Sequence, residues 1–319
     1  MRRSFVNPIL TRDDVPDVLP GVRDVSSVFN PGAARWRGRD LLLLRVQTRG
    51  RETLWMPAWS DDGIRFEIEP RVVEVGGLDA APEPVHHAYD PRLTVLDGEL
   101  IVAFAVDTDD ACRVAIARGG SLDDLALVSY DTSRDARNAV VFPERVGGRY
   151  LRLERPNRVA RSGAVPSGSE IVLAESDDLA TWSAVGPVMA GRPRSWDELI
   201  GSGPPPIRTR HGWLHVYHGV ATHFASVNLY QAGAVLLDGD DPTKVLARTR
   251  RNLLEPREPY EVVGQVPNVV FPSGMIVDGV SADPAVPGNS AAPDDARVRV
   301  YYGAADTCIG LATATVGEL

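Results

Sequence analysis

Apolar residues along the chain fall in short runs that are rich in β-branched and aromatic types and end at turn residues. Runs of this kind occur at 41–46, 99–104, 213–218 and 298–302. They are typical of β-strands, whereas no segment shows a sustained helical period of about 3.6 residues. Turn sequences such as Leu96-Asp97-Gly98 suit hairpins between neighbouring strands. The pattern therefore predicts an all-β protein.

The predicted strands are grouped in a pattern that recurs five times. Each copy enters a β-rich run through Asn, Pro or Asp residues, and the copies begin at Asn30, Asp90, Asn138, Pro204 and Asn268. Their spacing of about 50 to 65 residues is near the repeat length of propeller blades. In a propeller the inner strand of every blade lines one central funnel. We therefore predict a five-bladed β-propeller with four-stranded antiparallel blades and with the five openings facing that funnel.

The repeats account for nearly the whole chain of 319 residues, so we expect a single propeller domain over residues 1–319. Radial repetition lets one domain grow beyond the usual size because each blade packs only on its neighbours. The predicted blades are 30–75, 88–130, 137–190, 203–250 and 267–316, preceded by an N-terminal segment, 1–29. Two stretches that interrupt the blade rhythm, 156–169 and 278–296, are interpreted as surface loops.

The composition is that of an ordinary globular protein, with 44% hydrophobic and 24% charged residues. A formal net charge of −9 offers no broad basic surface, and two cysteines are too few for a disulfide framework. No apolar run approaches the roughly 18 residues needed to span a membrane, and the N-terminus lacks the apolar segment of a secretory signal. We therefore expect a cytoplasmic protein that binds neither nucleic acid nor membranes.

Seven short segments, one or two in each predicted blade, form a further pattern. They are Asn30-Pro31-Gly32-Ala33 with Leu42-Leu43-Leu44-Arg45, Tyr89-Asp90-Pro91-Arg92, Arg137-Asn138-Ala139-Val140-Val141-Phe142-Pro143 with Glu154-Arg155-Pro156, Ile200-Gly201-Ser202-Gly203-Pro204-Pro205, Gly212-Trp213-Leu214-His215-Val216-Tyr217-His218-Gly219, Tyr260-Glu261-Val262-Val263-Gly264 and Tyr302-Gly303-Ala304-Ala305-Asp306-Thr307. In this order they resemble the inverting β-mannoside phosphorylases and their hydrolase relatives, which are five-bladed propellers. The resemblance implies that a β-mannoside is cleaved by inorganic phosphate, a co-substrate, to give α-mannose 1-phosphate without a cofactor.

The resemblance also implies roles for individual residues. In inverting hydrolysis one carboxylic acid protonates the leaving oxygen and a second carboxylate activates water. Phosphate is already an anionic nucleophile, so a phosphorylase needs one acid and a cationic cradle. Asp90 matches the proton donor, which in some family members acts through a hydroxyl of the mannose. Arg137, Arg155 and His218 match the phosphate ligands, with Tyr230 as a fourth candidate.

Polar residues at the predicted blade openings match positions that contact mannosyl or acceptor hydroxyls in the family. They are Asn30, Arg45, Arg51, Tyr89, Asn138, Glu261 and Asp306. Such side chains can hydrogen-bond a ring of hydroxyls, although capping of strand ends is an alternative role for each of them. The indole rings of Trp36, Trp55 and Trp213 are interpreted as packing between blades.

No metal site is predicted. The histidines lack the H-E-x-x-H arrangement, and His215 and His218 point to opposite faces of one strand because they are three residues apart. There is also no G-x-S-x-G elbow, P-loop or dinucleotide fingerprint.

One position departs from the family pattern. Leu199 stands where the family often has a lysine before Ile-Gly, which removes one cation from the expected phosphate site. Two alternatives therefore stay open: an inverting β-mannosidase that uses water, with Glu261 or Glu144 as base, and a propeller that binds glycans without turning them over. The acceptor sugar, the linkage and the formation of a homo-oligomer are also left open.

Overall fold

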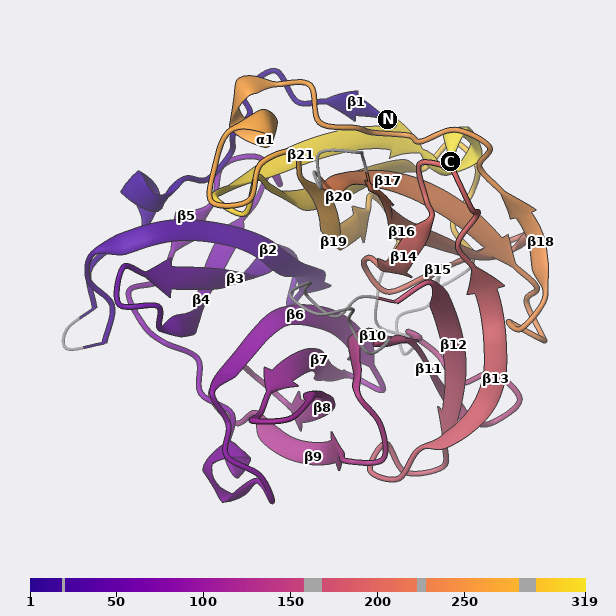
Figure 1. Ribbon diagram of the computed structural model, residues 1–319, viewed down its shortest axis with the longest axis horizontal. Coiled ribbons are helices and arrows are strands. Elements are labelled where there is room, and N and C mark those ends of the chain that lie inside the picture. Colours follow the sequence, from indigo (N-terminus) through magenta and orange to yellow (C-terminus); the bar gives the residue numbers. More distant parts are fainter. Residues whose placement is uncertain (19–20, 158–167, 223–227, 281–290) are drawn as a thin grey trace.

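The computed structural model describes residues 1–18, 21–157, 168–222, 228–280 and 291–319. Within these ranges the strands form five antiparallel sheets arranged around one centre (Figure 1). The predicted five-bladed propeller is therefore confirmed. Most of the two predicted surface loops falls at 158–167 and 281–290, outside the described residues.

Each blade runs outward from an inner strand near the centre. The first blade is β2 (Val25–Trp36), β3 (Arg39–Thr48), β4 (Thr53–Ser60) and β5 (Glu67–Ile68). The second is β6 (His87–Leu96), β7 (Glu99–Asp107), β8 (Cys112–Gly119) and β9 (Ala126–Asp131), and the third is β10 (Ala136–Val141), β11 (Tyr150–Pro156), β12 (Glu170–Ser176) and β13 (Ser183–Ala190). The fourth is β14 (Leu199–Ser202), β16 (Gly212–Thr222), β17 (Asn228–Leu237) and β18 (Val245–Arg248), with β15 (Ile207–Thr209) also paired to β16.

The fifth blade is closed by the N-terminus of the chain. Its strands are β19 (Val270–Val277), β20 (Arg297–Ala304), β21 (Cys308–Thr315) and, at the outer edge, β1 (Arg2–Arg3). The N-terminal segment expected at 1–29 thus supplies an edge strand, β1, and the first five residues of β2, 25–29. Two arginines carry no strand signal, so the sequence did not predict this pairing. The assignment of the whole chain to one domain stays a prediction.

The described helices are short. They are the α-helix α1 (Pro259–Val262) and the 3₁₀ turns η1 (Arg12–Asp14), η2 (Leu78–Ala80) and η3 (Val316–Glu318). None of the helices in the described part of the chain is long and apolar enough to cross a membrane.

Three inner strands contain the same irregularity. The registers of β2, β6 and β10 shift between Phe29 and Gly32, between Tyr89 and Arg92, and between Arg137 and Val140. Inside each shift lies a left-handed residue, namely Asn30 (φ 46°), Asp90 (φ 54°) or Asn138 (φ 55°). Asn and Asp adopt this conformation more readily than most residues, and a bulge re-aims side chains. Three of the five recurring residues found in the sequence are therefore bulge positions within the inner strands, whereas Pro204 lies between β14 and β15 and Asn268 precedes β19.

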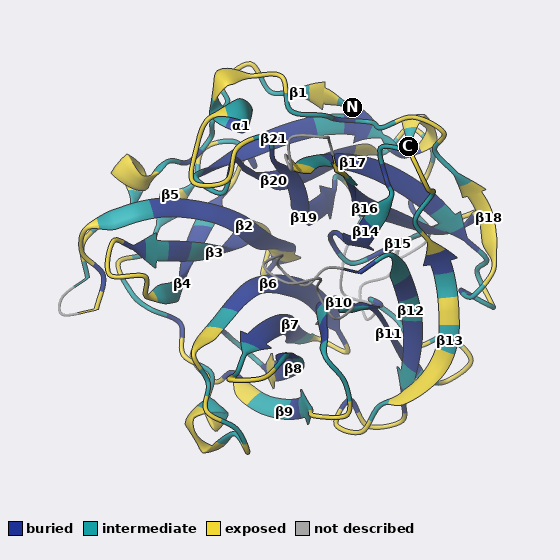
Figure 2. Ribbon diagram, in the orientation of Figure 1, coloured by how far each residue is buried: buried dark blue, intermediate teal, exposed yellow. Residues whose placement is uncertain are grey.

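The hydrophobic core lies between neighbouring blades. Trp36 and Trp55 belong to a cluster shared by the first and second blades, in which Trp55 meets Phe104 edge-on with ring centroids 4.9 Å apart. Trp213 meets Phe142 in the same way at 5.0 Å, between the third and fourth blades. These contacts confirm that the three tryptophans pack between blades. Figure 2 shows the inner strands largely buried and the outer strands more exposed.

Candidate active site

Asp90 lies buried where the inner strands of the first two blades meet. Its Oδ1 accepts hydrogen bonds from Asn30 Nδ2 at 3.0 Å and from Arg45 Nη1 at 2.9 Å. Asn30 is the bulge residue of β2, and Arg45 comes from β3, so the first blade supplies both donors. The bulges thus place the Asp90 carboxylate in a polar cluster at the centre of the propeller.

The surroundings of Asp90 favour its ionised form in the free protein. Burial alone would raise the pKa of this carboxyl, but Arg45, Arg92 and the hydrogen bond from Asn30 outweigh it, so the pKa lies below its usual range. A carboxyl that is to give up a proton at neutral pH must have a raised pKa when it acts. Asp90 is therefore ionised in the free site, whereas the reaction would require it to be protonated.

Arg137 and Arg155 lie directly opposite each other on β10 and β11. The Nε atoms of both are buried without a hydrogen-bond partner, and neither side chain forms an ion pair with a carboxylate within the described ranges. Burial, together with the neighbouring Arg137, lowers the pKa of Arg155 to about 10. Two facing like charges repel, so an anion placed between them would stabilise the pair.

His218 and Tyr230 complete this cluster from β16 and β17. The His218 ring lies 4.5 Å from Phe271 and 6.0 Å from Tyr230, measured between centroids. Both of its nitrogens are buried without a hydrogen-bond partner. Burial, with Arg155 and Arg92 nearby, holds the pKa of His218 well below its usual range, and the same Arg155 opposes the burial that raises the pKa of Tyr230. A neutral imidazole and a phenol hydroxyl thus lie beside the two arginines.

Two glycines allow the site to form because a side chain would collide with it. A Cβ on Gly201 would lie 2.4 Å from the His218 ring and 2.8 Å from Asn138 Oδ1, which itself has no partner. A Cβ on Gly303 would lie 1.9 Å from Asn30 Oδ1. These close approaches place Asn138 beside His218, which links the predicted sugar site to the predicted phosphate site.

Three further candidate sugar ligands surround Asp90. The Arg45 guanidinium stacks over the Tyr89 ring at 4.8 Å, and the Tyr89 hydroxyl donates to Asp107 at 2.9 Å. Asp306 follows β20 in a left-handed turn, and burial, with Asp90 nearby and Arg45 opposing, raises the pKa of its carboxyl to about 6. The two carboxyls therefore have pKa values shifted in opposite directions.

Two candidate sugar ligands lie outside this cluster. Arg51 is exposed in the turn between β3 and β4. Glu261 is fully buried on α1, where its oxygens accept from Arg3 Nε at 2.7 Å, the Tyr302 hydroxyl at 2.8 Å and the Arg257 backbone N–H at 2.8 Å. Contact of Glu261 with a sugar would require these bonds to break. The roles of both residues in sugar binding stay predictions.

The structure adds buried polar groups that sequence reasoning did not assign to the site. Arg92, Ser202 and His215 each have a buried side-chain atom without a partner. Arg92 belongs to the same motif as Asp90, which was the available signal. Ser202 follows Gly201, and burial lowers the pKa of His215 to about 3, which keeps its ring neutral.

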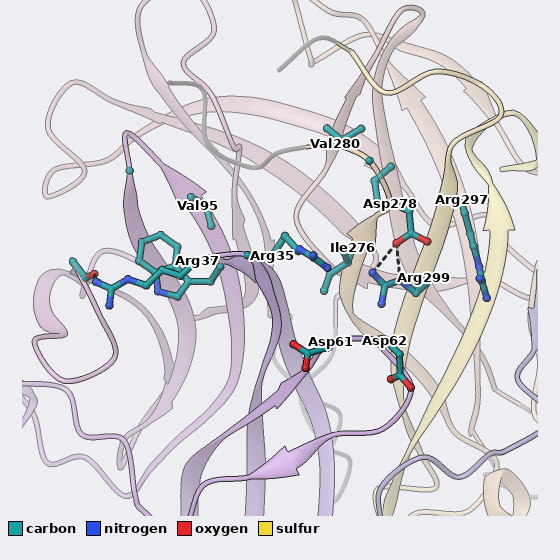
Figure 3. A pocket seen from close by; sticks show the side chains of 16 residues that line it. Arg35, Arg37, Asp61, Asp62, Val95, Ile276, Asp278, Val280, Arg297 and Arg299 are labelled. Atoms are coloured by element: carbon teal, nitrogen blue, oxygen red, sulfur yellow. Dashed lines mark hydrogen bonds and ion pairs between the residues drawn. The ribbon is translucent and has the colours of Figure 1, made fainter. Parts of the chain in front are cut away.

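A cavity of about 840 Å³ lies at the opposite end of the inner strands, where β2, β6 and β19 finish. Figure 3 shows Arg35, Arg37, Asp278 and Arg299 around it, with Arg299 already paired to Asp278. This cavity contains none of the candidate site residues. Within the described residues, no group of three or more His, Cys, Asp or Glu side chains is arranged to hold a metal ion.

The inner strands and their neighbours thus bring a carboxylate, neutral polar groups and two arginines without a carboxylate partner to one centre, an arrangement that fits the carbohydrate-processing enzymes its motifs resemble. The chain belongs to glycoside hydrolase family 130, whose model, described as beta-1,4-mannooligosaccharide phosphorylase, matches residues 8–319. It is 31% identical to the beta-1,4-mannooligosaccharide phosphorylase of Ruminococcus albus, over 99% of this chain and 89% of that protein. It is 32% identical to the 1,2-beta-oligomannan phosphorylase of Thermoanaerobacter sp., over 94% of each.

Solved structures agree with this assignment. The beta-1,2-mannobiose phosphorylase of Listeria innocua, in complex with beta-1,2-mannobiose, superposes with a TM-score of 0.80 and 25% identity. The match covers 99% of this chain and 97% of that one.

Proposed function

We propose that this protein is an inverting glycoside phosphorylase that cleaves β-mannosides with inorganic phosphate and releases α-mannose 1-phosphate. Family membership and relatives named as mannoside phosphorylases support the substrate class. The observation that carries the proposal is the facing pair of Arg155, which is buried, and Arg137, which is partly buried, neither with a carboxylate partner in the described structure. Planar guanidinium groups bind phosphate oxygens through paired N–H donors, and a hydrolase has no need of them.

In the proposed reaction Arg137 and Arg155 hold phosphate beside C1 of the mannosyl unit, with His218 and Tyr230 contacting the remaining oxygens. A phosphate oxygen forms a bond to C1 from the face opposite the leaving sugar, and the glycosidic C1–O bond breaks. The departing oxygen takes a proton that originates from Asp90, directly or through a mannose hydroxyl. Configuration at C1 is inverted because one displacement occurs.

The proton that the free Asp90 carboxylate lacks comes from solvent as the substrates bind. Arg45 and Arg92 depress the pKa of Asp90 in the free site. A phosphate held by Arg137 and Arg155 adds negative charge to the site that contains Asp90, and a bound sugar removes water from its carboxyl. Both changes raise the pKa of Asp90. Asp90 therefore takes up a proton as the site fills and becomes an acid in the complex.

The hydrolase alternative requires a second carboxylate as base, and its two named candidates are poorly placed for that role. Glu261 is already bonded by Arg3, Tyr302 and two backbone N–H groups. Glu144 follows β10 and lines a different cavity together with Leu93 and Pro205, near Arg208 at 3.9 Å. Phosphorolysis therefore has the better-supported set of side chains.

The test is product analysis with β-1,4- and β-1,2-linked mannobiose, with and without inorganic phosphate. We expect α-mannose 1-phosphate by proton NMR, and no cleavage in phosphate-free buffer. Arg137→Met should raise the phosphate KM by one to two orders of magnitude, since a charge-assisted hydrogen bond is worth about 1.5–3 kcal/mol. Arg149→Met, at a half-exposed ion pair on the same blade, is the matched control. Equal rates without phosphate, releasing free mannose, would refute phosphorolysis.

A further inference from the structure

Arg92 joins two blades that are not neighbours. It lies on β6 of the second blade, and its Nε donates to the Gly203 carbonyl at 2.9 Å, between β14 and β15 of the fourth blade. Its Nη1 donates to the Asp90 carbonyl at 3.0 Å. The side chain is 1% exposed. One guanidinium therefore connects the backbone of the Asp90 bulge in the second blade to the backbone of the fourth blade.

The segment that Arg92 reaches also borders the proposed phosphate site. Gly203 follows Gly201 and Ser202, and Gly201 lies against the His218 ring. A Cβ on Gly203 would lie 2.6 Å from the Val216 carbonyl, so this segment is packed closely on β16, the strand that carries His218. Movement of the Arg92 guanidinium would therefore displace both the Asp90 bulge and the backbone segment that borders His218.

The charge of Arg92 has no carboxylate bonded to it. Its Nη2 is buried without a partner, and no ion pair to Arg92 occurs among the described residues. The guanidinium lies 5.4 Å from the Phe271 ring centroid. Burial lowers the pKa of Arg92 to about 10, with the Asp90 carboxylate opposing this change and Arg45 adding to it. A neutral donor could make hydrogen bonds to the Gly203, Asp90 and Pro91 carbonyls without the free-energy cost of burying a charge, so these bonds alone do not explain an arginine here.

We propose that Arg92 is a positioning residue that fixes the Asp90 bulge against the fourth-blade edge of the phosphate site, so that acid and phosphate are held in one frame. The proposal rests on the function proposed above, because it assigns Arg92 a part in that reaction. Placing reacting groups within a near-attack geometry is worth several orders of magnitude in rate, and small displacements are costly.

The same charge acts on the titration of Asp90. The charged and polar groups that bear on this carboxyl are Arg45 from β3, Arg92 from β6, Asn30 from β2 and Asp306 after β20. Arg92 favours the ionised form of Asp90, so its removal raises the pKa of that carboxyl. A proton donor with a higher pKa stays protonated to higher pH, and the basic limb of the activity profile moves up.

The test compares Arg92→Met and Arg92→Lys in the full chain. Arg92→Met should lower kcat by about a hundredfold or more and move the basic limb of the kcat profile up by about one pH unit. Arg92→Lys keeps the charge but cannot reach both carbonyls with a rigid fork, so kcat should fall while the limb stays in place. The mannoside KM should change less than kcat in both variants.

Arg152→Met is the matched control, because Arg152 is also fully buried but is paired with Glu154 and Asp131 in the third blade. It should lose stability without moving the pH profile. The proposal is overturned if Arg92→Met keeps the wild-type kcat and pH profile, or if Arg152→Met moves the profile equally. If Arg92→Met does not fold, wild-type kcat in Arg92→Lys overturns it. The pH profile is measured with the product that the wild type releases, either α-mannose 1-phosphate or free mannose. Release of free mannose would refute phosphorolysis, whereas the role of Arg92 is still decided by the comparison of the variants.

Discussion

Arg137 and Arg155 face each other across β10 and β11 with both Nε atoms buried and no carboxylate paired to either in the described chain. Two other buried arginines, on β11 and β20, do have such partners: Arg152 binds Glu154, and Arg299 binds Asp278. Unpaired buried charge is costly. The facing pair is therefore better explained as a site awaiting an anion than as part of the framework.

This relationship predicts that anions stabilise the protein through these two residues. Inorganic phosphate should raise the melting temperature, since a ligand at a hundred times its Kd adds about 2.7 kcal/mol to the free energy of unfolding. Arg155→Met should abolish this increase and, in phosphate-free buffer, should unfold no earlier than the wild type because the repulsion from Arg137 is relieved. Thermal shift assays decide it. An undiminished phosphate effect in Arg155→Met would place the anion elsewhere.

Asp90 is predicted to be the proton donor. Asp90→Asn should lower kcat by about 10²–10⁴-fold, the usual cost of losing general acid catalysis. The variant should still fold, because asparagine tolerates the left-handed backbone at this bulge (φ 54°), but loss of the ion pair with Arg45 should lower its melting temperature. Asp107→Asn is the control, since Asp107 accepts a hydrogen bond from Tyr89 and makes no contact with Asp90. Loss of activity in Asp107→Asn with normal turnover in Asp90→Asn would reverse the assignment.

The sequence predicted the propeller because its local patterns repeat. Asn30, Asp90 and Asn138 recur at blade spacing, and each proved to be a bulge residue that directs a polar group to the centre. The pairing of Arg2–Arg3 with β21 could not be predicted, since a two-residue edge strand has no periodicity and depends on ring closure between distant parts of the chain.

The candidate site could be predicted only in part, because some of its contacts join residues that are far apart in the sequence. Asp90, Arg137 and His218 could be named from motifs, but the role of Arg92 depends on a contact with Gly203, 111 residues away. The same motif reading gave Glu261 a sugar-binding role, whereas the structure surrounds its carboxylate with Arg3 and Tyr302. Motifs indicate which residue types are present, and only the packing shows which of their atoms remain unpaired.

Asp306 predicts a pH dependence of anion binding. Burial raises the pKa of its carboxyl to about 6, so Asp306 is neutral below that pH and negatively charged above it. Sulfate keeps a constant charge from pH 5 to 7.5 and serves as the probe. Its Kd should increase severalfold as the pH rises through about 6, because the new carboxylate repels it. His218 contributes no change, since its pKa is held well below this range.

Calorimetric titration of sulfate at several pH values checks this dependence. Asp306→Asn should flatten it and leave binding as tight at pH 7.5 as at pH 5. Asp17→Asn, an exposed carboxylate outside the site, is the control and should retain the wild-type dependence. A pH dependence that persists in Asp306→Asn would assign the titration to another group.

Leu199 predicts a gain of function. It lies half-buried on β14, immediately before the Ile200-Gly201 segment that borders His218. If an ammonium at this position reaches the phosphate, Leu199→Lys should lower the phosphate KM by about tenfold, as expected for one charge-assisted hydrogen bond. The mannoside KM should stay the same. Leu246→Lys, on the exposed outer strand β18, adds the same charge away from the site and should leave both constants unchanged. A phosphate KM that is equally low in both variants would indicate general charge attraction, and an unchanged KM in Leu199→Lys would show that phosphate is bound beyond the reach of this strand.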